Sequence, residues 1–417
     1  MKRLRRSPWT FTDALNATLL LGTTVLFLGA STAPPALNPG RASTVPLNDS
    51  KESAPLLSSA DIRSLLAQHR FAALDRQLSE WQASYEQGVT SDEDLRAAFR
   101  VFYDTNPVLA SVYDAWVSEF PRSYIAHLIR GLYYTKIGED LPANQNVADL
   151  PQPQRDAAEA AYQRGLPDLR LSLSLTHRPI LTYVYLVWTS RAHGDVAESR
   201  RLLDASLKVD RDNYVVRASY MTAIETRWGG SQTMLKAFLK ESRHAKLSDR
   251  QLNVIESVLF EDQAWIHQFV DHDYAAAEVA YRRSAALGGD ASLHNLSDVL
   301  FKQAKYADAI LPLTELLGFD PNDLDVLGNR GFAYMQSGKP REAITDWTTA
   351  AQRGSAYAQN ELGRLYMIGV PGVLTPNPKT GIELFRLSAA QGNAAGVQNL
   401  HQALQLYPPA ASHGHTT

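Results

Sequence analysis

The feature that most constrains the fold is a set of small and aromatic residues that recurs after 34 positions. The stretch GNRGFAYMQSGKPREAITDWTTAAQRG, residues 328–354, carries this set at Gly331, Tyr334, Gly338, Ala343, Trp347 and Ala350. Ser297 and Ala309 precede Gly331 and Ala343 by the same 34 residues. Intervals of three and four residues place side chains on one face of a helix. A small residue on one helix beside a large one on the next lets two backbones approach, so the spacing predicts a series of packed helix pairs.

These stretches resemble the tetratricopeptide repeat, a 34-residue pair of antiparallel helices. The next stretch resembles the Sel-like variant of that repeat, through Trp347, Ala350, Ala351, Gly354, Ala358, Leu362, Gly363 and Tyr366. A second Sel-like copy follows at Phe385, Ala389, Ala390, Gly392 and Leu400. Its alanine pair comes 39 residues after the first, and the proline-rich insertion 371–378 explains the excess. The resemblance implies an all-α solenoid in which the small residues serve packing.

The N-terminal half carries a second resemblance. Its most distinctive stretches are HRFAALDRQLSEWQASYEQG, AFRVFYDTNPVLASVYDAW, FPRSYIAHLIRGLYYTKIG and RWGGSQTML. Through them, residues 61–240 resemble an uncharacterised bacterial family, a domain of unknown function often found with such repeats. The resemblance implies no activity, because none is assigned to that family.

The first 33 residues have the composition of a targeting segment. A basic start, Lys2 to Arg6, precedes the apolar stretch 14–33, which is about as long as a membrane-spanning helix requires. The basic flank should stay in the cytoplasm. We therefore expect a single-pass anchor in a bacterial inner membrane, with the rest of the chain in the periplasm. The alternative is a cleaved signal peptide and a soluble periplasmic protein, although Pro34 would be unfavourable after a cut at Ala33.

The sequence thus divides into five predicted parts. They are a signal anchor or signal peptide (1–33), a flexible linker (34–58), a helical domain of unknown function with degenerate repeats (59–240), a tetratricopeptide/Sel-like array (241–406) and a disordered tail (407–417). The fold class is all-α, a solenoid of antiparallel helix pairs behind one N-terminal membrane helix.

Composition excludes several kinds of chemistry. The chain has no cysteine, which removes disulfides, thiolate catalysis, iron–sulfur clusters and the lipid-accepting cysteine of bacterial lipoproteins. A net charge of −3 argues against binding nucleic acid by charge alone. No phosphate-binding loop, dinucleotide glycine pattern or serine-nucleophile elbow appears. We therefore expect no cofactor and no nucleic-acid partner.

Two local clusters deserve a chemical interpretation. His267, Asp271, His272 and Asp273 lie close in sequence, but their spacing favours a polar corner between helices over a metal site. The glycine pair in RWGGS favours a turn over a phosphate loop. In that turn a helix ends at Trp228, Gly229 is left-handed and Ser231 caps the next helix.

The predicted function is binding: an adaptor that holds a protein or peptide in the concave face of the helix stack, without enzymatic activity. Two alternatives remain, an immunity protein that neutralises a secreted toxin and an enzyme with a site in the N-terminal half. Arginine and aromatic side chains are enriched where binding energy concentrates. The candidate partner-binding residues are Tyr103, Trp116, Arg130, Tyr134, Arg227 and Trp228.

Overall fold

The computed structural model describes residues 58–140 and 150–408. Within these ranges every regular element is a helix, apart from one isolated bridge between Val370 and Leu374 in the proline-rich insertion. The predicted all-α architecture is therefore confirmed. The predicted membrane helix 14–33, the linker up to residue 57 and the tail from residue 409 lie outside the described residues. None of the described helices is both long and apolar enough to cross a membrane.

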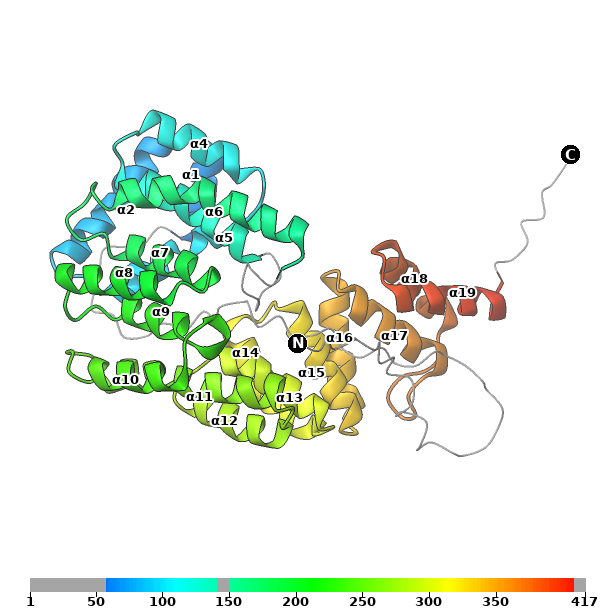
Figure 1. The fold of residues 1–417 in the computed structure, drawn as a ribbon. Helices are drawn as coiled ribbons and strands as arrows, with labels where there is room; N and C mark the ends of the chain where they lie inside the picture. Colours follow the sequence, from blue (N-terminus) through cyan, green and yellow to red (C-terminus); the bar gives the residue numbers. More distant parts are fainter. Residues whose placement is uncertain (1–57, 141–149, 409–417) are drawn as a thin grey trace, which may run out of the picture. The chain divides into compact units, whose positions relative to one another are not determined.

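The described residues form two compact units, 58–303 and 304–408 (with 141–149 outside the description). The division predicted between residues 240 and 241 falls inside the first unit. The helices of that unit (Figure 1) are α1 (Ser59–Ala67), α2 (Phe71–Glu86), α3 (Asp92–Ala98), the 3₁₀ helix η1 (Phe99–Tyr103), α4 (Leu109–Glu119), α5 (Tyr124–Asp140), α6 (Gln152–Ser172), α7 (Ile180–Ala192), α8 (Val196–Val209), α9 (Val215–Ala223), the 3₁₀ helix η3 (Thr226–Trp228), α10 (Gln232–Ser242), α11 (Asp249–Trp265), the π-helix η4 (Ile266–Val270), α12 (Tyr274–Ala286) and α13 (Ala291–Lys302).

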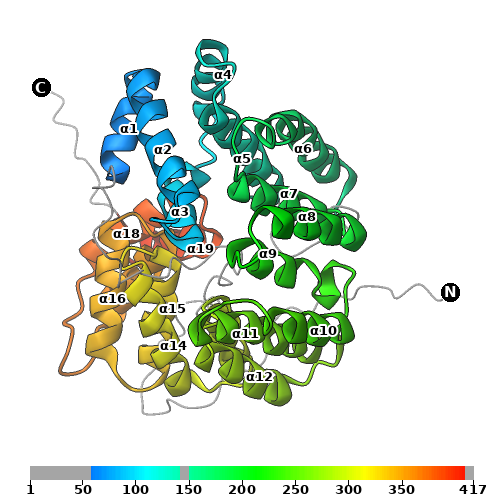
Figure 2. The ribbon, with the colours of Figure 1, turned by 90° about the vertical axis from the view of Figure 1, so that its left-hand side faces the viewer.

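The second unit, as far as it is described, contains six helices. They are α14 (Tyr306–Phe319), α15 (Leu324–Gln336), α16 (Pro340–Gln352), α17 (Ala356–Ile368), α18 (Pro378–Ala390) and α19 (Ala394–Leu406). Among them are the pairs α15–α16 and α17–α18. In both units a helix packs mainly against its neighbours in sequence, for example α5 on α6 and α17 on α18. Figure 2 shows α7, α8 and α9 side by side in the first unit. Nearest-neighbour packing of this kind is typical of helical-repeat proteins.

The predicted role of the small residues is confirmed by their contacts. A Cβ atom on Gly331 would lie 2.6 Å from Trp347 Nε1, and one on Gly363 would lie 2.6 Å from the ring of Phe385. The Trp347 side chain is 2% exposed, and its Nε1 donates a hydrogen bond to the carbonyl of Gly328 at 3.0 Å. Glycine therefore provides the space that the large ring of the following helix fills.

A long-range cap joins the start of the first unit to its middle. Asp92 Oδ2, on α3, accepts hydrogen bonds from the backbone amides of Tyr214 (2.6 Å) and Val215 (2.9 Å) at the start of α9. Burial raises the pKa of Asp92 to about 6, although the two amide hydrogen bonds oppose that rise. The carboxylate thus satisfies amides that α9 itself leaves without partners.

Candidate functional site

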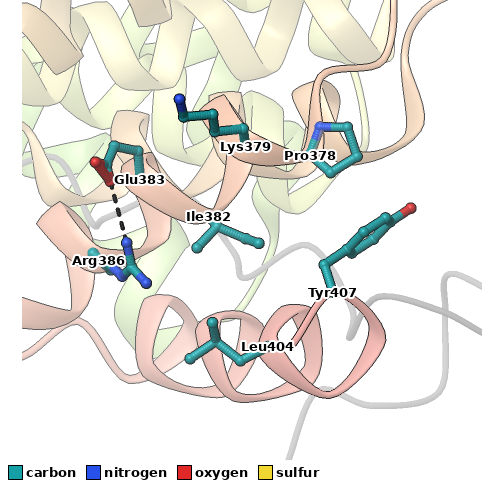
Figure 3. A pocket seen from close by; sticks show the side chains of 7 residues that line it. All are labelled: Pro378, Lys379, Ile382, Glu383, Arg386, Leu404 and Tyr407. Atoms are coloured by element: carbon teal, nitrogen blue, oxygen red, sulfur yellow. Dashed lines mark hydrogen bonds and ion pairs between the residues drawn. The ribbon is translucent and has the colours of Figure 1, made fainter. Parts of the chain in front are cut away.

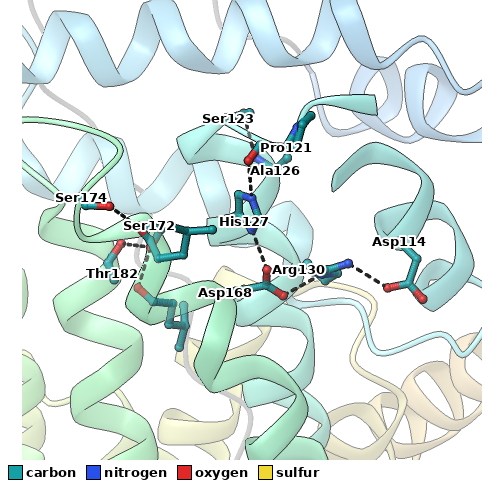
Figure 4. A network of polar contacts seen from close by, with 12 residues as sticks. Asp114, Pro121, Ser123, Ala126, His127, Arg130, Asp168, Ser172, Ser174 and Thr182 are labelled. Carbon is teal, nitrogen blue, oxygen red and sulfur yellow. Dashed lines mark hydrogen bonds and ion pairs between the residues drawn. The ribbon is translucent and has the colours of Figure 1, made fainter. Parts of the chain in front are cut away.

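A buried polar network joins α4, α5 and α6 (Figure 4). At its centre Asp168 accepts hydrogen bonds from Arg130 Nε (2.6 Å) and Nη2 (2.9 Å), and its Oδ1 lies 2.6 Å from His127 Nδ1. The other ring nitrogen of His127 lies 3.1 Å from the carbonyl oxygen of Pro121. Both ring nitrogens of His127 are therefore engaged, which leaves none to exchange a proton with a substrate.

The network continues outward through α4. Arg130 Nη1 pairs with Asp114 at 3.2 Å, and Asp114 pairs with Arg164 at 3.0 Å. The guanidinium of Arg164 lies 4.5 Å from the ring centroid of Tyr134. Burial alone would raise the pKa of Asp168, but hydrogen bonds from His127 and Arg130 outweigh it and hold that pKa below its usual range. We interpret this network as a clamp between helices, because its central groups bind one another.

A second group of side chains lies along η1, α5, α7 and the η3 turn. We call it the aromatic–cationic surface and define it as Tyr103, Lys136, Trp188, Arg191, Arg227 and Trp228. Lys136 Nζ lies 5.6 Å from the ring centroid of Tyr103 and 5.8 Å from that of Trp188. The Arg191 and Arg227 guanidinium groups lie 5.3 Å and 5.7 Å from the ring centroid of Trp228. These are cation–π distances.

Glu139 connects the two halves of the aromatic–cationic surface. Its carboxylate pairs with Lys136 Nζ at 3.1 Å and with Arg191 Nη2 at 2.7 Å. The side chains of Lys136, Arg191 and Arg227 keep 14%, 23% and 13% of their surface exposed. Trp188 and Trp228 are themselves buried, at 6% and 8% exposed, so the surface is ordered by internal contacts and offers mainly its cationic edges to solvent. Prearranged side chains of this kind bind with a smaller entropic cost than mobile ones.

Buried carboxylates hold the η3 turn in place through ion pairs and hydrogen bonds. Arg227 pairs with Glu225 at 2.5 Å and with Glu261 at 3.3 Å, while Asp262 accepts from the backbone amide (2.7 Å) and hydroxyl (2.8 Å) of Thr226. Burial raises the pKa of Glu225 to about 7, and the charge of Arg227 opposes that rise. These contacts fix the position of Trp228 at the edge of the surface.

The predicted geometry of the RWGGS turn is confirmed. Gly229 has a left-handed backbone (φ 92°), and the Ser231 side chain accepts the backbone amide of Met234 at the start of α10. Gly230 has no room for a side chain, since a Cβ would lie 1.9 Å from the carbonyl oxygen of Ile224. The glycine pair therefore serves the turn.

The six sequence-predicted site residues lie in three places. Tyr103, Arg227 and Trp228 belong to the aromatic–cationic surface. Arg130 and Tyr134 belong to the polar network, where Tyr134 is only 4% exposed. Trp116 is completely buried and stacks on Phe71 with ring centroids 5.8 Å apart, so it packs the core and offers no surface to a partner.

Several side chains of the surface were not among the predicted site residues. Trp188 and Arg191 stand three residues apart on α7, a helical spacing that brings an aromatic and a cationic side chain to one face. That spacing was the signal available for them. Lys136 carried no comparable signal, because its two aromatic neighbours come from η1 and α7.

The histidine-rich corner has the predicted geometry. His267 Nδ1 lies 3.0 Å from Asp271 Oδ2, His272 occupies the turn with a left-handed φ of 56°, and Asp273 caps α12 through the amide of Ala276. The described part of the chain contains no group of three or more His, Cys, Asp or Glu residues arranged to hold a metal ion.

A small pocket opens between α18 and α19 (Figure 3). Its volume is ≈ 300 Å³, and Ile382, Leu404 and Tyr407 supply its apolar lining. Glu383 and Arg386 lie 3.5 Å apart at its rim. The pocket could receive one apolar side chain, and it has no group arranged for catalysis.

Comparison with known proteins gives one specific match. Residues 58–197 match the family model described as a domain of unknown function (DUF4034). None of the curated proteins compared with the chain matches it.

Two solved structures show weak overall likeness. The human IFIT1 dimer with PPP-AAAA is 12% identical with a TM-score of 0.41, over 85% of this chain and 92% of that one. The P58(IPK) TPR domain is 14% identical with a TM-score of 0.25, over 83% of this chain and 96% of that one. Likeness at this level carries no argument about ligands or partners. The packed helix pairs give the described part of the chain a helical-repeat fold, and residues 58–197 match a domain of unknown function.

Proposed function

We propose that this protein is a scaffold that binds a protein or peptide partner through the aromatic–cationic surface. The observation that carries the proposal is the continuity of that surface. Two tryptophans, one tyrosine and three cations form a connected set of cation–π contacts across η1, α5, α7 and η3. Tryptophan and arginine are the residues on which interface binding energy most often concentrates. A binding role needs no reacting group, and both ring nitrogens of His127, the most deeply buried histidine of the polar network, are already engaged.

We further propose that residues 14–33 anchor the scaffold in a bacterial inner membrane with its helical part in the periplasm. The basis is the sequence alone, a basic start followed by an apolar stretch long enough to span a bilayer. Protease added to intact spheroplasts should digest the helical part and spare an N-terminal fragment. A fully protected chain would contradict this topology.

Partner capture tests the binding proposal. The full chain is crosslinked in its native envelope and purified, and its partners are identified by mass spectrometry. Lys136→Gln with Arg191→Gln removes two half-buried cations of the surface while it keeps both tryptophans. The matched control, Arg63→Gln with Arg201→Gln, removes two cations elsewhere; Arg63 is exposed and the Arg201 side chain is 73% exposed.

The proposal predicts a dominant partner whose recovery falls about tenfold or more in the surface variant, because charge-assisted contacts are lost. Recovery should not change in the control variant. Equal recovery in both variants would contradict binding at this surface. A secreted toxin as the partner would identify the binding as immunity.

A further inference from the structure

Two arginines beside the aromatic–cationic surface have no partner for their charge. Arg96 on α3 and Arg100 on η1 are four residues apart, which brings both to one side of consecutive helical turns. Both side chains are half-buried. Within the described residues neither guanidinium forms an ion pair with a carboxylate, and Arg96 Nε is enclosed without an acceptor.

Three other half-buried arginines among the described residues pair with carboxylates. Arg130 pairs with two carboxylates, and Arg227 does the same. Arg330 forms a two-pronged pair with Asp346, at 2.8 Å for both nitrogens.

The groups around the two arginines supply rings and further positive charge. The Arg96 guanidinium lies 5.2 Å from the ring centroid of Trp188, whose other cationic neighbour is Lys136. The Tyr103 hydroxyl lies close to Arg96 without a well-aligned hydrogen bond. An aromatic face attracts a cation but accepts no conventional N–H hydrogen bond, so the donors of Arg96 remain unused.

The nearby carboxylates already bind groups other than Arg96 and Arg100. Asp92, four residues before Arg96, gives its carboxylate to the amides of α9. Glu139 is shared by Lys136 and Arg191. Asp290 acts on Arg100 only at longer range, without an ion pair. Burial, and then the charge of Arg96, lower the pKa of Arg100, which shows that the two cations repel each other.

We propose that Arg96 and Arg100 form a binding site for an oxyanion, a carboxylate or a phosphate group. Guanidinium groups present paired donors that match such oxygens, and an anion between them would neutralise their mutual repulsion. The ring of Trp188 lies beside the Arg96 donors of the site. This goes beyond the scaffold function, because the site would take a free anion as well as one carried by a partner.

Anion-dependent thermal stability tests the site. The full chain is melted in sodium chloride, in inorganic phosphate, in succinate and with a hexaglutamate peptide, all at equal ionic strength. We expect phosphate or succinate to raise the melting temperature above that in chloride, in proportion to occupancy. Stabilisation by hexaglutamate as well would point to an anion carried by a peptide, and stabilisation by the small anions alone to a free ligand.

Variants separate a binding site from a structural one. Arg100→Gln should bind the anion about tenfold or more weakly, and it should melt no lower than the wild type in chloride, because it removes an unpaired cation. Arg100→Lys keeps the positive charge but lacks the paired N–H donors of a guanidinium group, so it should bind the anion with intermediate affinity. Arg201→Gln should bind as the wild type does.

Three results would overturn the proposal. They are identical melting in all four salts, an anion effect that survives Arg100→Gln, and a lower melting temperature of Arg100→Gln in chloride. None of them depends on capture of a protein partner, so the oxyanion site and the scaffold function can fail separately.

Discussion

Replacing Trp347 by alanine tests the packing that defines the repeat. The indole of Trp347 on α16 is 2% exposed and fills the space beside Gly331 on α15. Truncation of a buried tryptophan costs roughly 3–5 kcal/mol through lost burial and the cavity left behind. The lost hydrogen bond from Nε1 to the Gly328 carbonyl adds about 1 kcal/mol.

The assay is a thermal melt followed by circular dichroism, combined with hydrogen exchange. For a unit of this size such a loss lowers the melting temperature by on the order of 10 °C or more. Because repeat arrays are stabilised between neighbours, exchange protection should fall in α14 to α17 and stay unchanged in α5 to α7. Trp347→Phe, which keeps most of the ring, is the control and should lose much less. An unchanged melt of the alanine variant, or an equal loss of protection in both units, would refute the reasoning.

Three further predictions concern single positions. Gly363→Ala should destabilise the protein by about 1–3 kcal/mol, because its Cβ would lie 2.6 Å from the ring of Phe385. Gly318→Ala, at a helical glycine with open space around it, should stabilise the protein by up to about 1 kcal/mol. Urea titrations of both variants measure these changes. The pKa of Asp92 is about 6 in the folded protein and about 3.9 in the unfolded chain, so the folded state binds the proton more tightly. Protonation of Asp92 therefore stabilises the fold below pH 4, and this stabilisation is lost as the pH rises through 6. Relative to Asp92→Asn, the wild type should lose on the order of 3 kcal/mol between pH 4 and 7, and parallel pH curves for the two proteins would exclude this effect. Arg130→Met should lower the free energy of unfolding by about 3–5 kcal/mol at pH 7, because the buried carboxylate of Asp168 loses its guanidinium partner. The pKa of Asp168 is held low, so this loss of stability should shrink as acid protonates the carboxylate. A loss that does not depend on pH would argue against the ion pair.

The helix pairs were predictable because their signal is local. Spacings of three and four residues decide which side chains share a helix face. The glycine opposite a large ring is visible in the sequence at Gly331 and Trp347. The RWGGS turn was predictable for the same reason, since Gly229 and Ser231 act within a few residues of themselves.

Contacts between distant segments were not predictable in this way. The cap that Asp92 provides for α9 joins residues 122 and 123 positions apart, and the pair of His127 with Asp168 spans 41. No periodicity encodes either contact. Trp116 illustrates the limit for site prediction: its helix alone does not reveal that Phe71, from α2, covers the indole.

The central claim is that a partner binds at the aromatic–cationic surface, and site-specific photocrosslinking tests it most directly. A photoreactive phenylalanine analogue is placed at Tyr103 in the full chain and, as a control, at Val279, which is 70% exposed on α12. After irradiation in the native envelope, the account predicts one dominant adduct from position 103 and none of the same mass from position 279. No adduct at position 103, or the same adducts from both positions, would contradict it.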